Sequence, residues 1–187
     1  DQFPTDMVQG GAGTTVNMNA NEVIANRALE IMGHKRGEYQ FCSPNDHVNC
    51  AQSTNDAYPS AFRYAFIRMN RGLEAELKNL IASLRKKGDE FNDSIKMGRT
   101  QLQDAVPMTS GQEFHAFANN LEEEVANLER NVKLLYEINM GGTAIGTGLN
   151  AAAGYAELCI KKMCELTGEP FELASDLVEA TPDTGAY

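Results

Sequence analysis

Two long stretches of the chain repeat their apolar residues at the spacing of an α-helix. After Pro59, apolar side chains recur every three or four positions as far as Phe91, which predicts one helix of about thirty residues. A second stripe follows Thr109, which forms a capping-box pattern with Gln112. The apolar positions are Phe62, Phe66, Met69, Leu73, Leu77, Leu80, Leu84 and Phe91 in the first stripe, and Phe114, Phe117, Leu121, Val125, Leu128, Val132 and Leu135 in the second.

Shorter helices are predicted on either side of these stripes. Residues 17–32 have a short apolar face, and Gly33 is a natural stop for a helix there. Residues 152–166 predict another helix, with Gly168 as its stop. The segment 181–183 has a threonine followed by proline, which predicts the start of a further helix.

Together these elements predict an all-α protein built on a long-helix bundle. Long apolar stripes need partner helices to bury them, and a closed bundle normally contains about four or more helices. The polar, irregular segment 34–49 predicts a loop and a candidate domain boundary. We therefore expect the sequence to be an internal piece of a longer chain. Its bundle would be completed by further sequence, by other subunits, or by both.

Composition narrows the class of protein. A length of 187 residues with 42% hydrophobic content suits one globular domain, or one and part of a second. The net charge of -10 disfavours nucleic acid as a partner. The four cysteines form no CxxC pair, so reduced thiols in a cytoplasmic protein are expected. The three isolated histidines predict no metal site, and no apolar run is long enough to predict a membrane span.

Polar clusters interrupt the helical pattern at residues 10–19, 52–56 and 98–107. A helix N-terminus has free backbone N–H groups and a partial positive charge, and small hydroxyl and amide side chains add directed donors. Such a set suits a carboxylate better than a polyphosphate, because the sequence has no GxxxxGK[ST] loop. Plain helix capping is the alternative at 52–56. No predicted strand precedes the glycine-rich segment 141–148, so a tight connection or close packing fits it better than a dinucleotide site.

Four segments carry a family resemblance when they are taken together: GAGTTVNMNANEVIANRA, HVNCAQSTNDAYP, KMGRTQLQDAVPMT and GGTAIGTGLN. In this order they resemble the aspartase/fumarase superfamily, most closely its aspartase branch. The resemblance covers essentially the whole chain. It implies a homotetramer with a central core of long helices and with composite active sites, each built from several subunits. It also implies that residues 1–51 end a mixed N-terminal domain and that residues 52–187 begin the helical-bundle domain.

The resemblance implies a chemistry as well: reversible elimination of ammonia from L-aspartate to give fumarate, with no cofactor and no metal. Ser53 and Thr54 match the pair that holds the β-carboxylate of the substrate. They would stabilise its growing negative charge while a base removes the Cβ proton, with Thr100 as a third catalytic group. Thr14 matches a threonine that contacts substrate. Asn55 and Thr100 match positions near the substrate amino group.

Gln101 favours the aspartase branch, because fumarase-like sequences usually have His at this position. A glutamine cannot act as an acid or a base, so its implied role is to position the substrate. The alternatives are a fumarate hydratase, which acts on fumarate and malate, and a helical module without catalytic activity. No segment resembles the GSSxMPxKxNP loop that carries the family's serine base. We therefore expect the 187 residues alone to bind substrate weakly and not to catalyse.

Overall fold

The computed structural model describes residues 2–6, 8 and 10–187, and its contacts divide the chain into two compact units. The first unit contains Asp1–Ala65 and Leu135–Tyr187, and the second contains Phe66–Leu134. The boundaries of these compact units differ from the domain boundary after residue 51 that the family resemblance implies. The boundary after residue 51 therefore stays a prediction.

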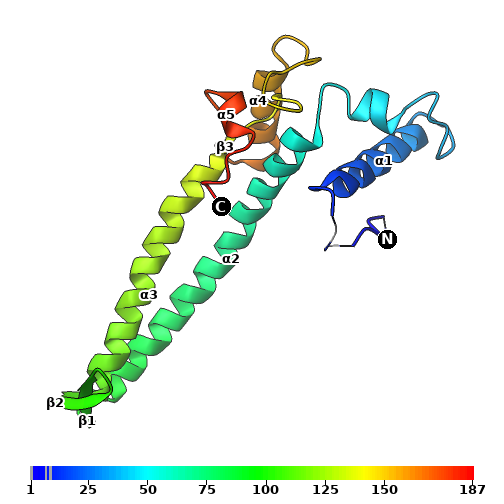
Figure 1. Ribbon diagram of the computed structural model, residues 1–187. Coiled ribbons are helices and arrows are strands. Elements are labelled where there is room, and N and C mark those ends of the chain that lie inside the picture. Colours follow the sequence, from blue (N-terminus) through cyan, green and yellow to red (C-terminus); the bar gives the residue numbers. More distant parts are fainter. Residues whose placement is uncertain (1, 7, 9) are drawn as a thin grey trace. The chain divides into compact units, whose positions relative to one another are not determined.

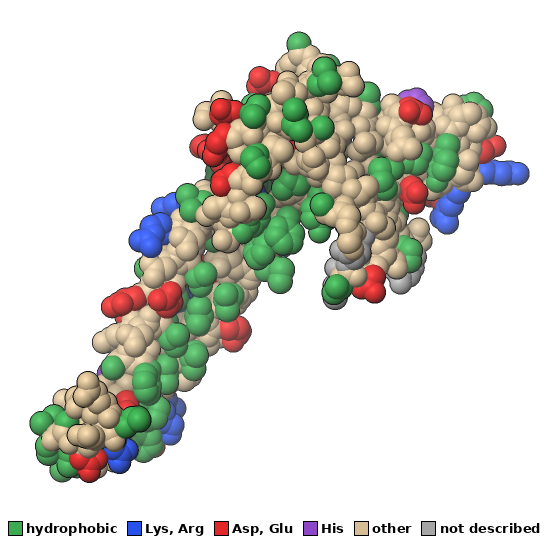
Figure 2. Space-filling model, in the orientation of Figure 1, with side chains coloured by type: hydrophobic (Ala, Val, Ile, Leu, Met, Phe, Trp, Pro, Cys, Tyr) green, Lys and Arg blue, Asp and Glu red, His purple; other side chains and the backbone are tan. Residues whose placement is uncertain are grey.

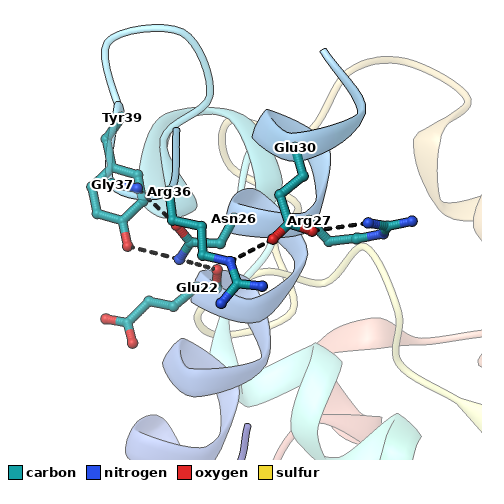
Figure 3. Close-up of polar contacts among 7 residues, drawn as sticks. All are labelled: Glu22, Asn26, Arg27, Glu30, Arg36, Gly37 and Tyr39. Carbon is teal, nitrogen blue, oxygen red and sulfur yellow. Dashed lines mark hydrogen bonds and ion pairs between the residues drawn. The ribbon is translucent and has the colours of Figure 1, made fainter. Parts of the chain in front are cut away.

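Helix α1, Thr14–Ile31, opens the first unit (Figure 1). It ends before Gly33, as predicted, but it begins three residues earlier than expected, directly after Gly13 in the left-handed conformation (φ 89°). On its exposed side, Glu30 pairs with both Arg27 and Arg36, and Asn26 accepts from the Gly37 amide (Figure 3). These contacts join α1 to the loop that follows it.

The predicted loop at 34–49 is largely irregular, with a single π-helical turn at Pro44–Val48. The Ser43 side chain caps this turn, because its hydroxyl oxygen accepts from the Asp46 amide at 3.2 Å. His47 Nδ1 accepts from the Ser43 amide at 2.8 Å, so this histidine is hydrogen-bonded within the loop.

The two long helices confirm the apolar stripes. Helix α2 is Thr54–Glu90, which the two units divide after Ala65, and helix α3 is Ser110–Val132, followed by a 3-10 turn at Lys133–Tyr136. The predicted capping box is present, with Thr109 and Gln112 side chains each accepting from the other's backbone. Within the second unit α2 and α3 run side by side (Figure 1) and bury Ile81, Ala118 and Val125 between them.

Much of each stripe nevertheless stays uncovered. Figure 2 shows apolar side chains exposed along the second unit. They include Met69, which is 73% exposed, together with Leu73, Leu80 and Phe117. Burying such side chains stabilises a protein by roughly 1.5 to 3 kcal/mol each, so this surface is suited to packing against further helices. None of the helices among the described residues could span a membrane.

A β-hairpin at the far end of the second unit was not predicted. Strands β1, Ile95–Thr100, and β2, Gln103–Thr109, pair antiparallel with Thr100 opposite Gln103. The pairing is irregular between Met97 and Arg99. Gly98 explains part of the geometry, because a Cβ there would lie 2.9 Å from the Val106 carbonyl oxygen. The protein is still predominantly helical, as the all-α prediction required.

The rest of the first unit consists of short elements. Strands β3, Glu137–Ile138, and β4, Glu172–Leu173, pair in parallel. Helix α4, Tyr155–Thr167, ends at Gly168 as predicted and begins slightly later than expected. The prediction of a helix starting at Thr181 is wrong. The short helix α5, Leu177–Ala180, lies just before it, because Asp176 caps the Val178 and Glu179 amides.

Candidate active site

The polar residues before α2 do cap this helix. The Ser53 hydroxyl oxygen accepts from the Asn55 amide at 3.2 Å, and Asp56 Oδ1 accepts in return from the Ser53 amide at 2.9 Å. The contact from Asp56 back to the Ser53 amide is that of a capping box with Asp in place of Glu or Gln, while the Ser53 hydroxyl caps the second amide of the helix instead of the third. Among the described residues the Ser53 hydroxyl donates to no acceptor, so its hydrogen can be directed to a ligand. Capping and anion binding are therefore compatible at this serine.

The Thr54 hydroxyl also accepts a hydrogen bond, in this case from a network of asparagine side chains that includes two residues of α1. Its hydroxyl oxygen accepts from Asn17 Nδ2 at 3.1 Å. Asn49 Oδ1 accepts from Asn21 Nδ2 at 3.0 Å, and Asn17 Nδ2 lies 3.4 Å from the same oxygen. Because the acceptor side of the Thr54 hydroxyl is occupied, its hydrogen is the part available to a carboxylate. Two neighbouring hydroxyls thus present donors at the N-terminus of a long helix, where anions are favoured.

Asp56 is a functional candidate that the sequence reading did not single out. Its side chain is 0% exposed, and its second carboxylate oxygen accepts from the Gly141 and Thr143 amides at 3.3 and 2.8 Å. Burial raises the pKa of this carboxyl, while the backbone N–H donors act in the opposite direction. The available signal was the position of Asp56 in the capping box, but its partners in the glycine-rich loop could not be inferred from spacing.

The glycine-rich segment 141–148 forms a tight connection, as predicted. A Cβ at Gly146 would lie 2.3 Å from the Leu177 carbonyl oxygen, and one at Gly141 would lie 2.6 Å from the Ala156 Cβ. Both glycines have a positive φ, 92° at Gly141 and 89° at Gly146. This segment therefore needs glycine for packing as well as for backbone conformation.

Pro59 lies inside α2 and leaves one carbonyl of the first turn without its usual helical donor. Asn139 Nδ2 supplies a replacement, because it donates to the Asn55 carbonyl oxygen at 3.0 Å. The Asn55 side chain donates in turn to the Ala144 carbonyl oxygen at 2.6 Å. The first turn of α2 and the segment 139–144 are thus joined by side-chain contacts in both directions.

The same two segments border an open cavity of about 670 Å³ in the first unit. Ser53 lines it, and so do Thr143 and Ala144 of the segment that donates to Asp56. The polar residues of the lining are Asn45, Asp46, Asn49, Gln52, Ser53, Thr143, Thr147 and Asn150. The lining also contains Ile145 and Leu149, so the cavity combines apolar side chains with a few hydroxyl and amide groups that can orient a small ligand.

Thr14 lies on a different cavity of the same unit, of about 390 Å³, with Thr15 and Asn19 among its neighbours. Its link to the Ser53–Thr54 pair runs through α1, since Asn17 on the next turn contacts Thr54. Gly13 fixes the start of this helix, because a Cβ there would lie 2.6 Å from the Tyr58 ring.

Replacing this glycine tests the anchoring of Thr14. In the full-length protein, Gly13→Ala is expected to lower the free energy of unfolding by about 2 kcal/mol, through the positive φ and the clash with Tyr58. Chemical denaturation followed by circular dichroism measures the change. Gly10→Ala is the matched control, because a Cβ at Gly10 meets no atom within 4 Å. Equal stabilities of the two variants would contradict the anchoring role.

The remaining predicted site residues are not brought to Ser53 within one described unit. Thr100 and Gln101 belong to the second unit, at the tip of the β1–β2 hairpin. The turn residues Gln101 and Leu102 both have a positive φ, 48° and 65°, and the Leu102 side chain is 98% exposed. Non-glycine residues rarely adopt this region of φ, but the two central residues of a tight hairpin turn of type I′ both require it.

Among residues 2–6, 8 and 10–187, no three His, Cys, Asp or Glu side chains form a group that could hold a metal ion. His34 stacks on Phe41 with ring centroids 3.8 Å apart, and His115 Nε2 lies 3.2 Å from Asp89. The four cysteines are free thiols.

The mainly helical fold and the two hydroxyls at a helix N-terminus agree with the class of protein that the sequence comparison identifies. The chain belongs to the lyase family, whose sequence model matches residues 1–187. Over all 187 residues it is 58% identical to the aspartate ammonia-lyase of Escherichia coli strain K12, of which it covers 39%.

Solved structures agree with this placement. A Brucella melitensis structure described as fumarate lyase:delta crystallin bound to cobalt has a TM-score of 0.92 and 54% identity, with 97% of this chain and 40% of that chain covered. A class II fumarase from Schistosoma mansoni has a TM-score of 0.81 and 35% identity, with coverage of 96% and 41%. The chain thus spans about two fifths of the length of these relatives.

Proposed function

We propose that the full-length protein containing these residues is an aspartate ammonia-lyase, which converts L-aspartate reversibly to fumarate and ammonia. The observation that carries the proposal is the pair of hydroxyls at Ser53 and Thr54, whose oxygens accept from Asn55 and Asn17 and whose hydrogens are left for a ligand, in a chain 58% identical to an aspartate ammonia-lyase. The proposed enzyme uses no cofactor and no metal. Its free thiols suit the cytoplasm.

In the proposed mechanism the substrate's β-carboxylate sits against the Ser53 and Thr54 hydroxyls. A base removes a proton from Cβ, and the electron pair moves into the β-carboxylate to give an intermediate with extra negative charge on the carboxylate oxygens. The pair then returns to form the C–C double bond as the C–N bond breaks and ammonia leaves. Donors already aimed at these oxygens stabilise the intermediate more than the substrate, which accelerates proton removal.

The other predicted residues complete the proposed site from neighbouring copies. We place Thr14 as a further substrate contact, Asn55 and Thr100 near the substrate amino group, and Gln101 as a group that positions the substrate. Another subunit of a homotetramer would supply Thr100 and Gln101. The exposed tip at Gln101 and Leu102 supports this assignment, because it suits insertion into a partner. The base would come from sequence beyond these 187 residues, so the same residues expressed alone are proposed to be inactive.

Substrate choice tests the proposal. The full-length protein is expected to form fumarate from L-aspartate and to release one ammonia for each fumarate, measured by ultraviolet absorbance and a coupled ammonia assay. L-malate is the comparison substrate, because fumarate hydratase is the second candidate and a class II fumarase shares this fold at 35% identity. Turnover of malate with none of aspartate would replace the first proposal by the second.

A further inference from the structure

Burying the side chain of Asp56 costs folding free energy. Its carboxylate is fully buried, and no lysine, arginine or histidine among the described residues forms an ion pair with it. Removing an ionised carboxylate from water is unfavourable unless hydrogen bonds compensate. Here the compensation comes from backbone N–H groups, one in its own helix cap and two in a segment more than 80 positions away.

The two oxygens of Asp56 bind to different segments of the cavity lining. Oδ1 accepts from the amide of Ser53, at the start of α2. Oδ2 accepts from the amides of Gly141 and Thr143, and Thr143 belongs to the second segment that lines the cavity. Ser53 and Thr143 both line the cavity, whereas Asp56 lies behind them. One carboxylate therefore fixes the distance between the Ser53 hydroxyl and the second segment of the lining.

We propose that Asp56 is a positioning residue for substrate binding. It holds the Ser53 hydroxyl and the 141–144 loop at a fixed spacing, so that both bind the same substrate carboxylate. This inference rests on the proposed function, since it assigns Asp56 to the same dicarboxylate site. Asp56 does not touch the substrate. It acts through the backbone of Ser53 and through the loop.

The contacts around Asp56 make a subtle variant informative. Asp56→Asn keeps the shape of the side chain but turns one acceptor oxygen into an N–H donor, which then faces a backbone N–H. The links from Asn139 to the Asn55 carbonyl and from Asn55 to the Ala144 carbonyl remain. The two segments are therefore expected to stay joined, but the spacing between the Ser53 hydroxyl and the 141–144 loop is expected to change.

The experiment measures how strongly the full-length protein prefers a second carboxylate. Succinate and butyrate have the same carbon chain, but only succinate has two carboxylates, so the ratio of their inhibition constants reports on the site. We expect Asp56→Asn to lower this preference about tenfold or more, the size of effect that loss of one charged hydrogen bond produces. The KM for L-aspartate is expected to rise with it.

Asp176→Asn is the matched control, because Asp176 also caps a helix but is exposed and borders no part of the cavity. It should leave the preference for succinate unchanged. If the wild-type protein shows no preference for succinate, the proposed function itself fails. If wild type prefers succinate and Asp56→Asn keeps the same preference, only the role of Asp56 is overturned.

Hydrogen exchange in the wild-type protein provides a test that does not depend on the variant folding. Succinate is expected to slow amide exchange in both segments, 52–57 and 139–144, because both bind the carboxylate. Butyrate is expected to slow exchange less. Slower exchange in both segments with succinate supports the inference. Protection of one segment alone, or of neither, would overturn it.

Discussion

Ser53→Ala in the full-length protein is expected to lower kcat/KM for L-aspartate by about 10²- to 10³-fold, the cost of removing one preorganised donor to a developing oxyanion. The hydroxyl oxygen is already occupied by the Asn55 amide, so its hydrogen is the group that substrate would lose. Most of the loss should appear in kcat, because the donor matters most when the carboxylate carries its extra charge. Steady-state kinetics measure both parameters.

The same substitution removes a helix cap, which costs about 1 kcal/mol of stability. Kinetics should therefore be measured well below the unfolding temperature of the variant. Ser83→Ala is the matched control, since Ser83 is an exposed serine of the same helix whose hydroxyl donates only to the Asn79 carbonyl at 2.9 Å. Equal kcat/KM values for Ser53→Ala and Ser83→Ala would overturn the catalytic role of Ser53, whereas no turnover of L-aspartate by the wild-type protein would favour the helical-module alternative.

The long helices were predictable because their determinants are local. The stripe in α2 and the capping box at Thr109 each depend on residues within a few positions of one another. The β1–β2 hairpin depends instead on pairing, and its sequence lacks the usual signals. Strand β1 alternates apolar and polar residues only over its first three positions, and its turn has Gln101 and Leu102 where Asn and Gly are preferred.

The candidate site divides in the same way. Ser53 and Thr54 could be predicted as site residues because they belong to a cluster of small polar residues directly before a predicted helix. Their hydrogen bonds at the start of α2 follow from that position. Asp56 was missed because the Gly141 and Thr143 amides that define its role lie 85 and 87 positions away. Thr100 presents a different problem: it lies in the other compact unit, so the unit that contains Ser53 does not show whether the two residues share a site.

Assembly can be tested by combining two inactive variants. Ser53→Ala and Thr100→Ala are each expected to lose about 10²- to 10³-fold in kcat/KM as homogeneous proteins. When both are expressed in the same cells, composite sites predict that activity returns. If each site takes Ser53 from one subunit and Thr100 from another, random mixing leaves about one quarter of the sites with both residues intact in a symmetric oligomer.

A site built within a single chain predicts the opposite result. Every copy would then lack one of the two residues, and co-expression would leave activity at the level of the single variants. Purification through different tags on the two variants establishes that mixed oligomers have formed before the activity is compared. Recovery toward one quarter of the wild-type kcat would place Thr100 and Ser53 of different copies at one substrate, because no other arrangement restores both hydroxyls.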